Sequence, residues 1–365
     1  HSQNARFECI DGMRGFLALG VFIHHSAIWH QYIQIGLWEA PKSNIYNQFG
    51  QTSVSFFFMI TSFLFISKLI NSAEKGFNWR NFFISRIFRL GPMYYFSLLV
   101  IIISVMFITN WQLQIGIRPF LDSIFKWSLF TINGLTDING SELTSKVGAG
   151  VVWSLPYEWL FYFSLPIISI FILKVKHKIG YIALSVIFIF VFYKVHEIYP
   201  YHIYSFIGGA IAPFLIRYTQ FYKKINKNLA SLVIIACLII LCLHSTAFNI
   251  YNVIFSSLAF TLVALGFSVF GLLKNSTLKF LGEICYSTYL LHGIVLFTVF
   301  YFGFGFEYSK SLNPFQYSLV IFSITPIVVI ISFLGFKFIE KPFMDKSKII
   351  IQKLNLRDEK KKNNK

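Results

Sequence analysis

Charged residues are scarce in this chain. Only 13% of its 365 residues are Asp, Glu, Lys or Arg, whereas soluble domains carry roughly 25%. Apolar residues make up 56% of the chain, including 44 Phe. A globular core of this size cannot bury so many phenylalanines, but helices that face lipid need no polar cover. The composition excludes a water-soluble fold and predicts that membrane helices fill most of the chain.

Cysteine and acidic residues are also few. The four cysteines show no CxxC spacing, so neither a disulfide framework nor a zinc site follows, and we expect no metal cofactor. Asp and Glu number 15 against 32 Lys and Arg, which gives a formal net charge of +17. The basic residues lie in short clusters between apolar runs, as in cytoplasmic loops of membrane proteins, which argues against a nucleic-acid partner.

Apolar runs long enough to cross about 30 Å of hydrocarbon occupy nearly all of the chain up to residue 338. We expect about ten spans, at 15–29, 53–70, 90–108, 151–173, 180–195, 201–216, 229–243, 250–273, 278–302 and 315–338. In the long connection 110–150, residues 120–130 are expected to form an amphipathic helix in the membrane interface. The predicted fold is an all-α, polytopic transmembrane helical bundle, with a membrane-embedded domain over 7–342 and a basic cytoplasmic tail over 343–365.

Lys and Arg are distributed unevenly between the two sets of loops. If the N-terminus is cytoplasmic, the outer loops contain only Lys42, Arg118, Lys126, Lys146, Lys194 and Lys310. The inner side contains the Lys-rich tail and Arg6, Arg14, Lys68, Lys75, Arg80, Arg86, Arg89, Lys174, Lys176, Lys178, Arg217, Lys223, Lys224, Lys227, Lys274 and Lys279. This asymmetry predicts that both termini are cytoplasmic. We interpret the terminal run 360–362 as a solvated, positive-inside segment.

Ionisable side chains inside a bilayer are costly and usually face a cavity or the bundle interior, so each is a functional candidate. Arg14 and His25 are eleven residues apart, which places them on one helix face and ~16 Å apart in depth. Arg14 is expected at the cytoplasmic edge and His25 near mid-membrane. The alternative is that His24 and His25 only pack between helices and that Arg14 only marks the cytoplasmic side.

Two further arginines are expected at the start of the third span. Arg86 and Arg89 have i, i+3 spacing and share a helix face, where the helix N-terminus would add positive potential. Such a pair suits a phosphate group. Positive-inside bias alone is the alternative, but it explains two stacked arginines beside Arg14 less well.

Two more ionisable residues are expected at mid-membrane depth. Glu158 lies about two turns into a span that enters from outside, and His292 lies about ten residues into a span that enters from the cytoplasm. An unpaired carboxylate there would be expensive, so one alternative is that these two residues are only structural partners. Together with His25 they predict a polar cavity above cationic groups, the arrangement that a phosphate-bearing donor requires.

These residues lie in segments that resemble the acyltransferase-three family of integral membrane acyltransferases, especially bacterial and phage O-antigen acetylases. The resemblance covers residues 7–342. It rests on the family's order of segments, namely Ile10-Asp11-Gly12-Met13-Arg14-Gly15 leading to His25, Ser55 to Leu64, Arg86 to Pro92, Trp153-Ser154-Leu155 with Glu158, Tyr286-Ser287 to His292, and Ile339-Glu340-Lys341-Pro342-Phe343. Met13, Thr61 and Leu291 depart from the family's usual residues at positions that are not ionisable.

The resemblance implies acetyl-CoA as donor, a glycan or lipid-linked saccharide hydroxyl such as that of lipopolysaccharide O-antigen as acceptor, and a location in the bacterial inner membrane. It also implies that Arg14 and His25 are the functional signature. We expect the donor's phosphates on Arg14, Arg86 and Arg89, with the pantetheine arm carrying the thioester towards His25.

For the chemistry, His25 is expected to act as general base or to be acetylated itself. Glu158 would orient His25, and His292 would polarise the thioester carbonyl or hold the acceptor. A transporter or flippase is the alternative function, since buried His and Glu can relay protons. It would favour paired, Gly- or Pro-broken spans in two halves, and no such repeat is visible. A purely structural membrane protein would have no reason to keep these groups at one depth.

Overall fold

The computed structural model describes residues 3–73, 76–172, 179–244 and 246–363. Every regular element in these ranges is a helix. The inner-side cations Lys75, Lys174, Lys176 and Lys178 lie outside the described residues, as do the last two residues of the predicted tail. The predicted all-α class is confirmed for the described part of the chain.

Long helices account for most of the expected apolar segments. They are α1 (Gln3–Ile35), α2 (Asn44–Asn71), α3 (Trp79–Ile108), α6 (Ser154–Ile172), α7 (Ile179–Val195), α8 (Pro200–Tyr218), α9 (Lys227–Cys242), α10 (Ile250–Ala264), α12 (Cys285–Phe297), α14 (Pro314–Gly335) and α15 (Lys341–Asn363). Short elements connect them: α4 (Ile117–Ser128), η1 (Ile138–Gly140), α5 (Thr144–Val147), η2 (Val151–Trp153), η3 (Phe221–Lys224), η4 (Leu272–Lys274), α11 (Ser276–Glu283), η5 (Thr298–Gly303), α13 (Phe306–Ser311) and η6 (Phe336–Glu340).

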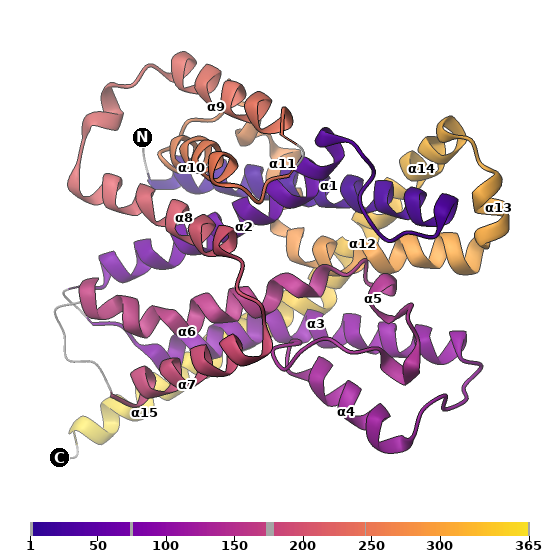
Figure 1. The fold of residues 1–365 in the computed structure, drawn as a ribbon. Coiled ribbons are helices and arrows are strands. Elements are labelled where there is room, and N and C mark those ends of the chain that lie inside the picture. Colours follow the sequence, from indigo (N-terminus) through magenta and orange to yellow (C-terminus); the bar gives the residue numbers. More distant parts are fainter. Residues whose placement is uncertain (1–2, 74–75, 173–178, 245, 364–365) are drawn as a thin grey trace.

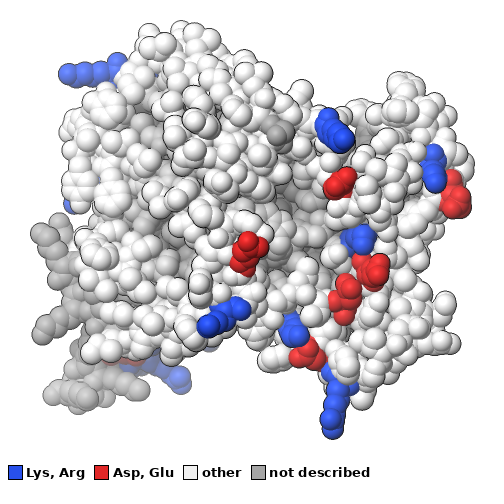
Figure 2. All heavy atoms as spheres, in the orientation of Figure 1, with Lys and Arg blue, Asp and Glu red and all other residues white. Residues whose placement is uncertain are grey.

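Five helical stretches among the described residues are long and apolar enough to cross a membrane: Asn44–Asn71, Trp79–Ile108, Val151–Ile172, Cys285–Gly303 and Pro314–Lys360. Helices α7, α9 and α10 are apolar but shorter. Figure 2 shows one face of the molecule, which carries few charged side chains. In Figure 1 helix α1 begins and α15 ends on the same side of the bundle. The structure therefore confirms membrane helices, while the count of about ten spans and the cytoplasmic side remain predictions.

Two expected spans are interrupted. Helix α10 ends at Ala264 instead of continuing to residue 273, because the chain turns at Gly266 and Gly271, whose φ angles are +104° and +91°. The segment 278–302 is divided at Ile284 into α11 and α12. The hydrophobic pattern gave no sign of either break.

Helix α11 lies directly against α1. A Cβ atom added to Gly282 would lie 1.9 Å from the carbonyl oxygen of Asp11, and one added to Gly15 would lie 2.1 Å from that of Leu278. Only glycine allows two helix backbones to approach so closely in a membrane bundle. This contact fixes the first turns of α1, which contain Arg14, against the start of the segment that leads to His292.

A helix was expected over residues 120–130 of the long connection. Helix α4 confirms it. Ile117, Leu121 and Phe125 recur every four residues and are exposed, whereas Trp127 is buried and donates a hydrogen bond from Nε1 to the carbonyl oxygen of Thr136 at 2.8 Å. One apolar stripe therefore points away from the protein. Its place in the membrane interface remains a prediction.

The predicted C-terminal tail continues the last helix. Helices α14, η6 and α15 follow one another without a break, and α15 packs against α3. Arg80 of α3 forms an ion pair with Asp358 at 3.0 Å, and Asn81 donates to Asn355 at 3.0 Å. Residues 343–363 are thus a helix docked on α3. Lys360 is exposed, while the side chains of residues 361–362 lie outside the described part.

Candidate active site

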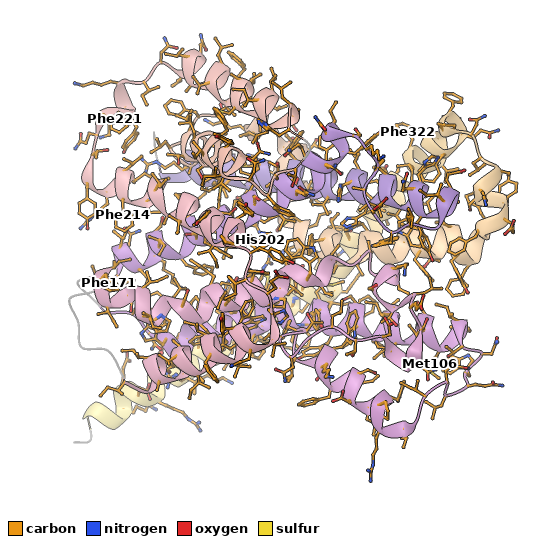
Figure 3. The ribbon with its side chains drawn as sticks, in the orientation of Figure 1. Met106, Phe171, His202, Phe214, Phe221 and Phe322 are labelled. Atoms are coloured by element: carbon orange, nitrogen blue, oxygen red, sulfur yellow. The ribbon has the colours of Figure 1, made fainter. Side chains whose placement is uncertain are left out.

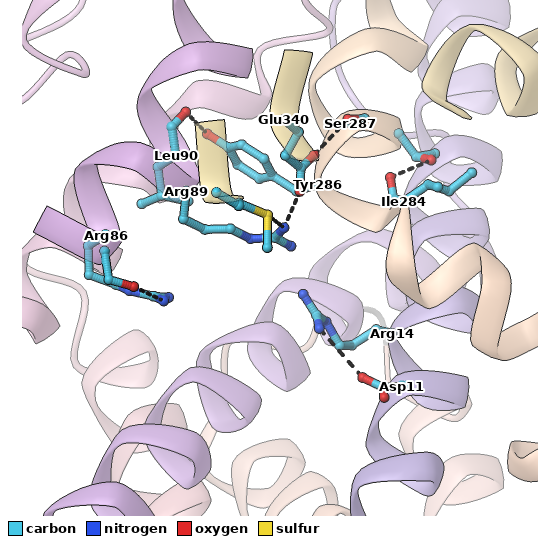
Figure 4. Close-up of polar contacts among 12 residues, drawn as sticks. Asp11, Arg14, Arg86, Arg89, Leu90, Ile284, Tyr286, Ser287 and Glu340 are labelled. Atoms are coloured by element: carbon cyan, nitrogen blue, oxygen red, sulfur yellow. Dashed lines mark hydrogen bonds and ion pairs between the residues drawn. The ribbon is translucent and has the colours of Figure 1, made fainter. Parts of the chain in front are cut away.

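The three arginines singled out in the sequence line one cavity of about 120 Å³. Arg14 comes from α1, and Arg86 and Arg89 come from α3. Figure 4 shows the three side chains directed towards a common space. Glu158 of α6 lies in the wall of the same cavity. We call this cavity, lined by Arg14, Arg86, Arg89 and Glu158, the arginine cavity.

Arg14 is held at the cavity by the close packing of its own helix. The flanking Gly12 and Gly15 face the backbones of η4 and α11, so that no side chain separates the helices on that side. The Arg14 guanidinium forms an ion pair with Asp11, one turn earlier, over 3.6 Å. This separation is long for an ion pair, and Asp11 is half exposed. Much of the charge of Arg14 therefore remains available to a ligand.

Arg89 is neutralised by a residue that sequence reasoning did not include in the site. Its guanidinium forms an ion pair with Glu340 of η6, which is fully buried and also accepts a hydrogen bond from Ser287 Oγ at 2.7 Å. Figure 4 shows this network beside Tyr286. Glu340 was noted only as part of the closing motif of the last span. A fully buried carboxylate such as Glu340 needs a cationic partner, because an isolated buried charge is strongly penalised.

Arg86 has no carboxylate partner within ion-pair distance among the described residues. Its guanidinium donates to Ser85 Oγ at 3.1 Å and lies 4.8 Å from the ring centroid of Phe65 and 6.0 Å from that of Tyr162. Aromatic faces stabilise a cation without neutralising it. No ion pair within the described residues therefore neutralises Arg86.

The helix N-terminus does not add to this charge, and that expectation was wrong. Helix α3 begins at Trp79 and is capped by Asn78, whose side chain accepts from the backbone N–H of Asn81 at 3.1 Å. Arg86 and Arg89 lie in later turns, and the helix-dipole effect fades within the first turn. The positive charge that lines the cavity is that of the arginine side chains.

Glu158 belongs to the arginine cavity. Its carboxylate accepts a hydrogen bond from Tyr162, one turn later on α6. The structure does not bring Glu158 into hydrogen-bond contact with His25. Tyr162 is a site residue that sequence reasoning missed, although its i+4 spacing from Glu158 was a usable signal.

His25 and His292 are brought together, as their expected depths predicted. Nδ1 of His25 lies 3.1 Å from Nε2 of His292, and the ring centroids are 5.0 Å apart. His292 is fully buried, whereas His25 is partly exposed. We call these two residues the histidine pair. The neighbouring His24 instead places Nδ1 2.7 Å from the carbonyl oxygen of Tyr46, which fits the packing role considered for it.

The backbone contacts of the histidine pair define which nitrogens carry protons. Nδ1 of His292 lies 2.9 Å from the carbonyl oxygen of Thr288, and a carbonyl can only accept, so this nitrogen is the donor. In the neutral ring Nε2 of His292 is then an acceptor. Nδ1 of His25 lies between that acceptor and the carbonyl oxygen of Val21 at 3.0 Å, so it too carries the proton. Nε2 of His25 is left with a free lone pair, suited to act as base or nucleophile.

Tyr289 connects the two parts of the site. Tyr289 lines the arginine cavity, and its ring centroid is 6.4 Å from that of His292. Its hydroxyl lies 2.7 Å from Ser154 Oγ and donates to the carbonyl oxygen of Val151 at 2.7 Å. Sequence reasoning quoted the segment that contains Tyr289 but gave it no role. Its position one turn before His292 was the available signal.

Comparison with protein families identifies the class. A sequence model of the acyltransferase-three family, described as an acyltransferase domain, matches residues 7–336. The chain therefore belongs to this family of acyltransferases, as the resemblance of its motifs predicted. Comparisons with curated proteins and with solved structures found no match.

Proposed function

We propose that this protein is a membrane O-acetyltransferase that transfers an acetyl group from cytoplasmic acetyl-CoA to a hydroxyl of an extracytoplasmic glycan, such as lipopolysaccharide O-antigen, in a bacterial inner membrane. Family membership supports acyl transfer in general. The observation that carries the finer proposal is the arginine cavity, which shares helices α1 and α12 with the histidine pair. The positive charge of the cavity suits a polyanionic donor, and a neutral imidazole with a free Nε2 suits the transfer step.

In the donor site, Arg14 and Arg86 bind the phosphates of the donor. Their charges are only partly compensated, and a guanidinium matches a phosphate with two parallel hydrogen bonds. Arg89 contributes less charge because Glu340 neutralises it. Small-molecule sites usually measure about 300–1,000 Å³, so the arginine cavity, at about 120 Å³, widens when the donor binds.

In the transfer step, Nε2 of His25 removes the proton of the acceptor hydroxyl as its oxygen attacks the thioester carbonyl. The carbon–sulfur bond then breaks, and the CoA thiolate takes up the proton. While His25 is cationic, its Nδ1–H donates to Nε2 of His292. The two-step route, in which Nε2 of His25 is first acetylated and the hydroxyl attacks next, uses the same geometry.

Purified protein in nanodiscs tests the proposal. With acetyl-CoA labelled in its acetyl group and a delipidated O-antigen polysaccharide, we expect release of CoA thiol and label in the polysaccharide. Mass spectrometry of surface glycans from cells with and without the gene should show the same acetyl group. Proton flux or glycan movement without any thiol release would contradict the proposal and favour the transporter alternative.

A further inference from the structure

A second, larger cavity lies on the opposite face of the first turns of α6. Ser154, Leu155 and Glu158 line the arginine cavity, whereas Trp153, Pro156 and Tyr157 line this other cavity of about 700 Å³. Its remaining wall includes Glu197 and Tyr199 from the α7–α8 connection, His202 of α8, and Phe248. We call it the aromatic cleft. Figure 3 places His202 near the centre of the molecule, and Figure 2 shows a hollow in the central part of this face.

The aromatic cleft combines ring faces with a few polar atoms. The ring centroids of Trp153, Tyr157 and Phe248 lie 5.0, 4.7 and 4.9 Å from that of His202. Trp153 and Tyr199 are 37% and 48% exposed, so the cleft can be reached from outside the protein. An apolar wall with a few oriented polar groups is the usual composition of a small-molecule site.

His202 has an unmet hydrogen-bonding capacity. The residue is only 4% exposed, and its Nδ1 has no hydrogen-bond partner among the described residues. A buried polar atom without a partner is unfavourable, so a ligand that supplies one is favoured. Beside it, the Tyr199 hydroxyl donates to Glu197 Oε2 at 2.8 Å, and the Tyr157 hydroxyl donates to the carbonyl oxygen of Glu197 at 2.7 Å.

We propose that the aromatic cleft binds one pyranose ring of the acceptor. The apolar C–H face of a sugar stacks on an aromatic ring, and its hydroxyls require acceptors and donors at the edge. Trp153 offers the exposed ring, while Glu197, Tyr199 and Nδ1 of His202 offer the polar atoms. No Lys or Arg occurs among the described residues that line the cleft, so a phosphate headgroup finds no counter-charge there.

The cleft is adjacent to the proposed reaction site, and this inference rests on the proposed function. Phe58 lines the arginine cavity, and its ring centroid also lies 5.7 Å from that of His202. Trp153 precedes Ser154, whose hydroxyl is paired with that of Tyr289 beside His292. His25 does not line the aromatic cleft. The bound ring is therefore a neighbour of the sugar unit that is acetylated.

Titration of the full-length protein in nanodiscs tests the cleft directly. The probes are the methyl glycosides of glucose, galactose, rhamnose and N-acetylglucosamine, with sorbitol and glycerol 3-phosphate as ringless probes. We expect at least one glycoside to bind, and Trp153→Ala and His202→Phe each to weaken its affinity about tenfold or more. Trp111→Ala is the matched control, because Trp111 is exposed in the preceding connection and does not line the cleft.

Each failure has a separate meaning. Binding of acetyl-CoA and release of its thiol are measured on the same samples. If the wild type binds no glycoside, or binds glycosides as tightly after Trp153→Ala and His202→Phe as before, the cleft assignment is overturned even though thiol release continues. Preference for glycerol 3-phosphate over every glycoside also overturns it. If glycosides bind but no thiol is released, the proposed function fails and the sugar site stands.

Discussion

The arginine cavity and the histidine pair share helices α1 and α12, but their electrostatic requirements are opposite. The cavity keeps positive charge available, because Arg86 rests on aromatic rings and Arg14 has a distant partner. The histidine pair is neutral, and each ring is fixed through a backbone carbonyl. A site for phosphates needs uncompensated charge, whereas a base needs a free lone pair. Under the proposed function, the difference predicts that donor binding and proton transfer are separable by mutation.

Replacement of His25 should give the largest effect. We expect His25→Ala to lower turnover by roughly 10²- to 10⁴-fold, because the general base is lost, while acetyl-CoA affinity changes less than about twofold, since Arg14 and Arg86 are untouched. Turnover assays and isothermal titration with a non-hydrolysable acetyl-CoA analogue measure the two quantities. His24→Ala is the control, as His24 pairs with Tyr46 instead of His292. Full turnover in His25→Ala would contradict the assignment of His25 as the general base.

Removal of Glu340 should destabilise the protein. Glu340→Ala leaves Arg89, whose side chain is only 14% exposed, without its partner, and breaking a buried pair costs about 3–5 kcal/mol. Thermal melting in detergent should show a clear loss of stability. The double variant Arg89→Met with Glu340→Gln should recover most of it, because no unpaired charge remains. An unchanged melting temperature in the single variant would show that Arg89 is as free as Arg86.

Removal of Arg14 or Arg86 should weaken donor binding. We expect Arg14→Ala and Arg86→Ala each to raise KM for acetyl-CoA roughly 10- to 100-fold, because each removes the binding free energy of one charge-assisted hydrogen bond. Turnover at saturating donor should be better preserved. Arg86→Lys should restore only part of the affinity, because an ammonium lacks the planar fork. Arg80→Ala on the same helix is the control, since Arg80 pairs with Asp358. Equal donor affinity in Arg14→Ala and wild type would contradict the phosphate site.

Glu158→Gln tests whether Glu158 acts in donor binding or in the orientation of His25. Glutamine can still accept the Tyr162 hydrogen bond, so we expect a folded protein with transfer reduced by about threefold, expressed in KM for acetyl-CoA. Tyr162→Phe should behave alike. A large fall in turnover with unchanged KM would instead assign Glu158 to orienting His25, as the sequence suggested. Wild-type kinetics would remove Glu158 from the site.

Topology can be tested with variants that should leave activity unchanged. In a Cys242→Ser background, a cysteine at Gln114 should react with an impermeant thiol reagent in intact cells, and one at Lys224 should react only after permeabilisation. Both native side chains are exposed. Asn139 is unsuitable, because it is buried and its amide donates to Thr109 and to the carbonyl oxygen of Gln112. The reverse labelling would place the arginine cavity on the outer side.

Periodicity and charge in the sequence predicted the helices and most of the candidate site residues. Apolar runs indicated the helices, and ionisable residues within or beside those runs singled out Arg14, Arg86, Glu158 and His25, because such groups are costly in lipid. The partner of Arg89 could not be inferred, since Glu340 lies at the far end of the chain and only the packing of η6 against α3 joins them. The break at Ile284 lies beside the close backbone contact between Gly282 and α1, which hydrophobicity does not encode.

Helix α1 carries Arg14 and His25 on one unbroken rod from Gln3 to Ile35. Their axial separation of ~16 Å therefore does not change when other helices move apart to admit a donor. If Arg14 holds the phosphates, the thioester reaches Nε2 of His25 only when the arm between the phosphates and the sulfur matches the separation of Arg14 and His25 along α1. The proposed function therefore predicts that a donor with a truncated arm binds as firmly as acetyl-CoA but reacts slowly, because its thioester does not reach Nε2 of His25.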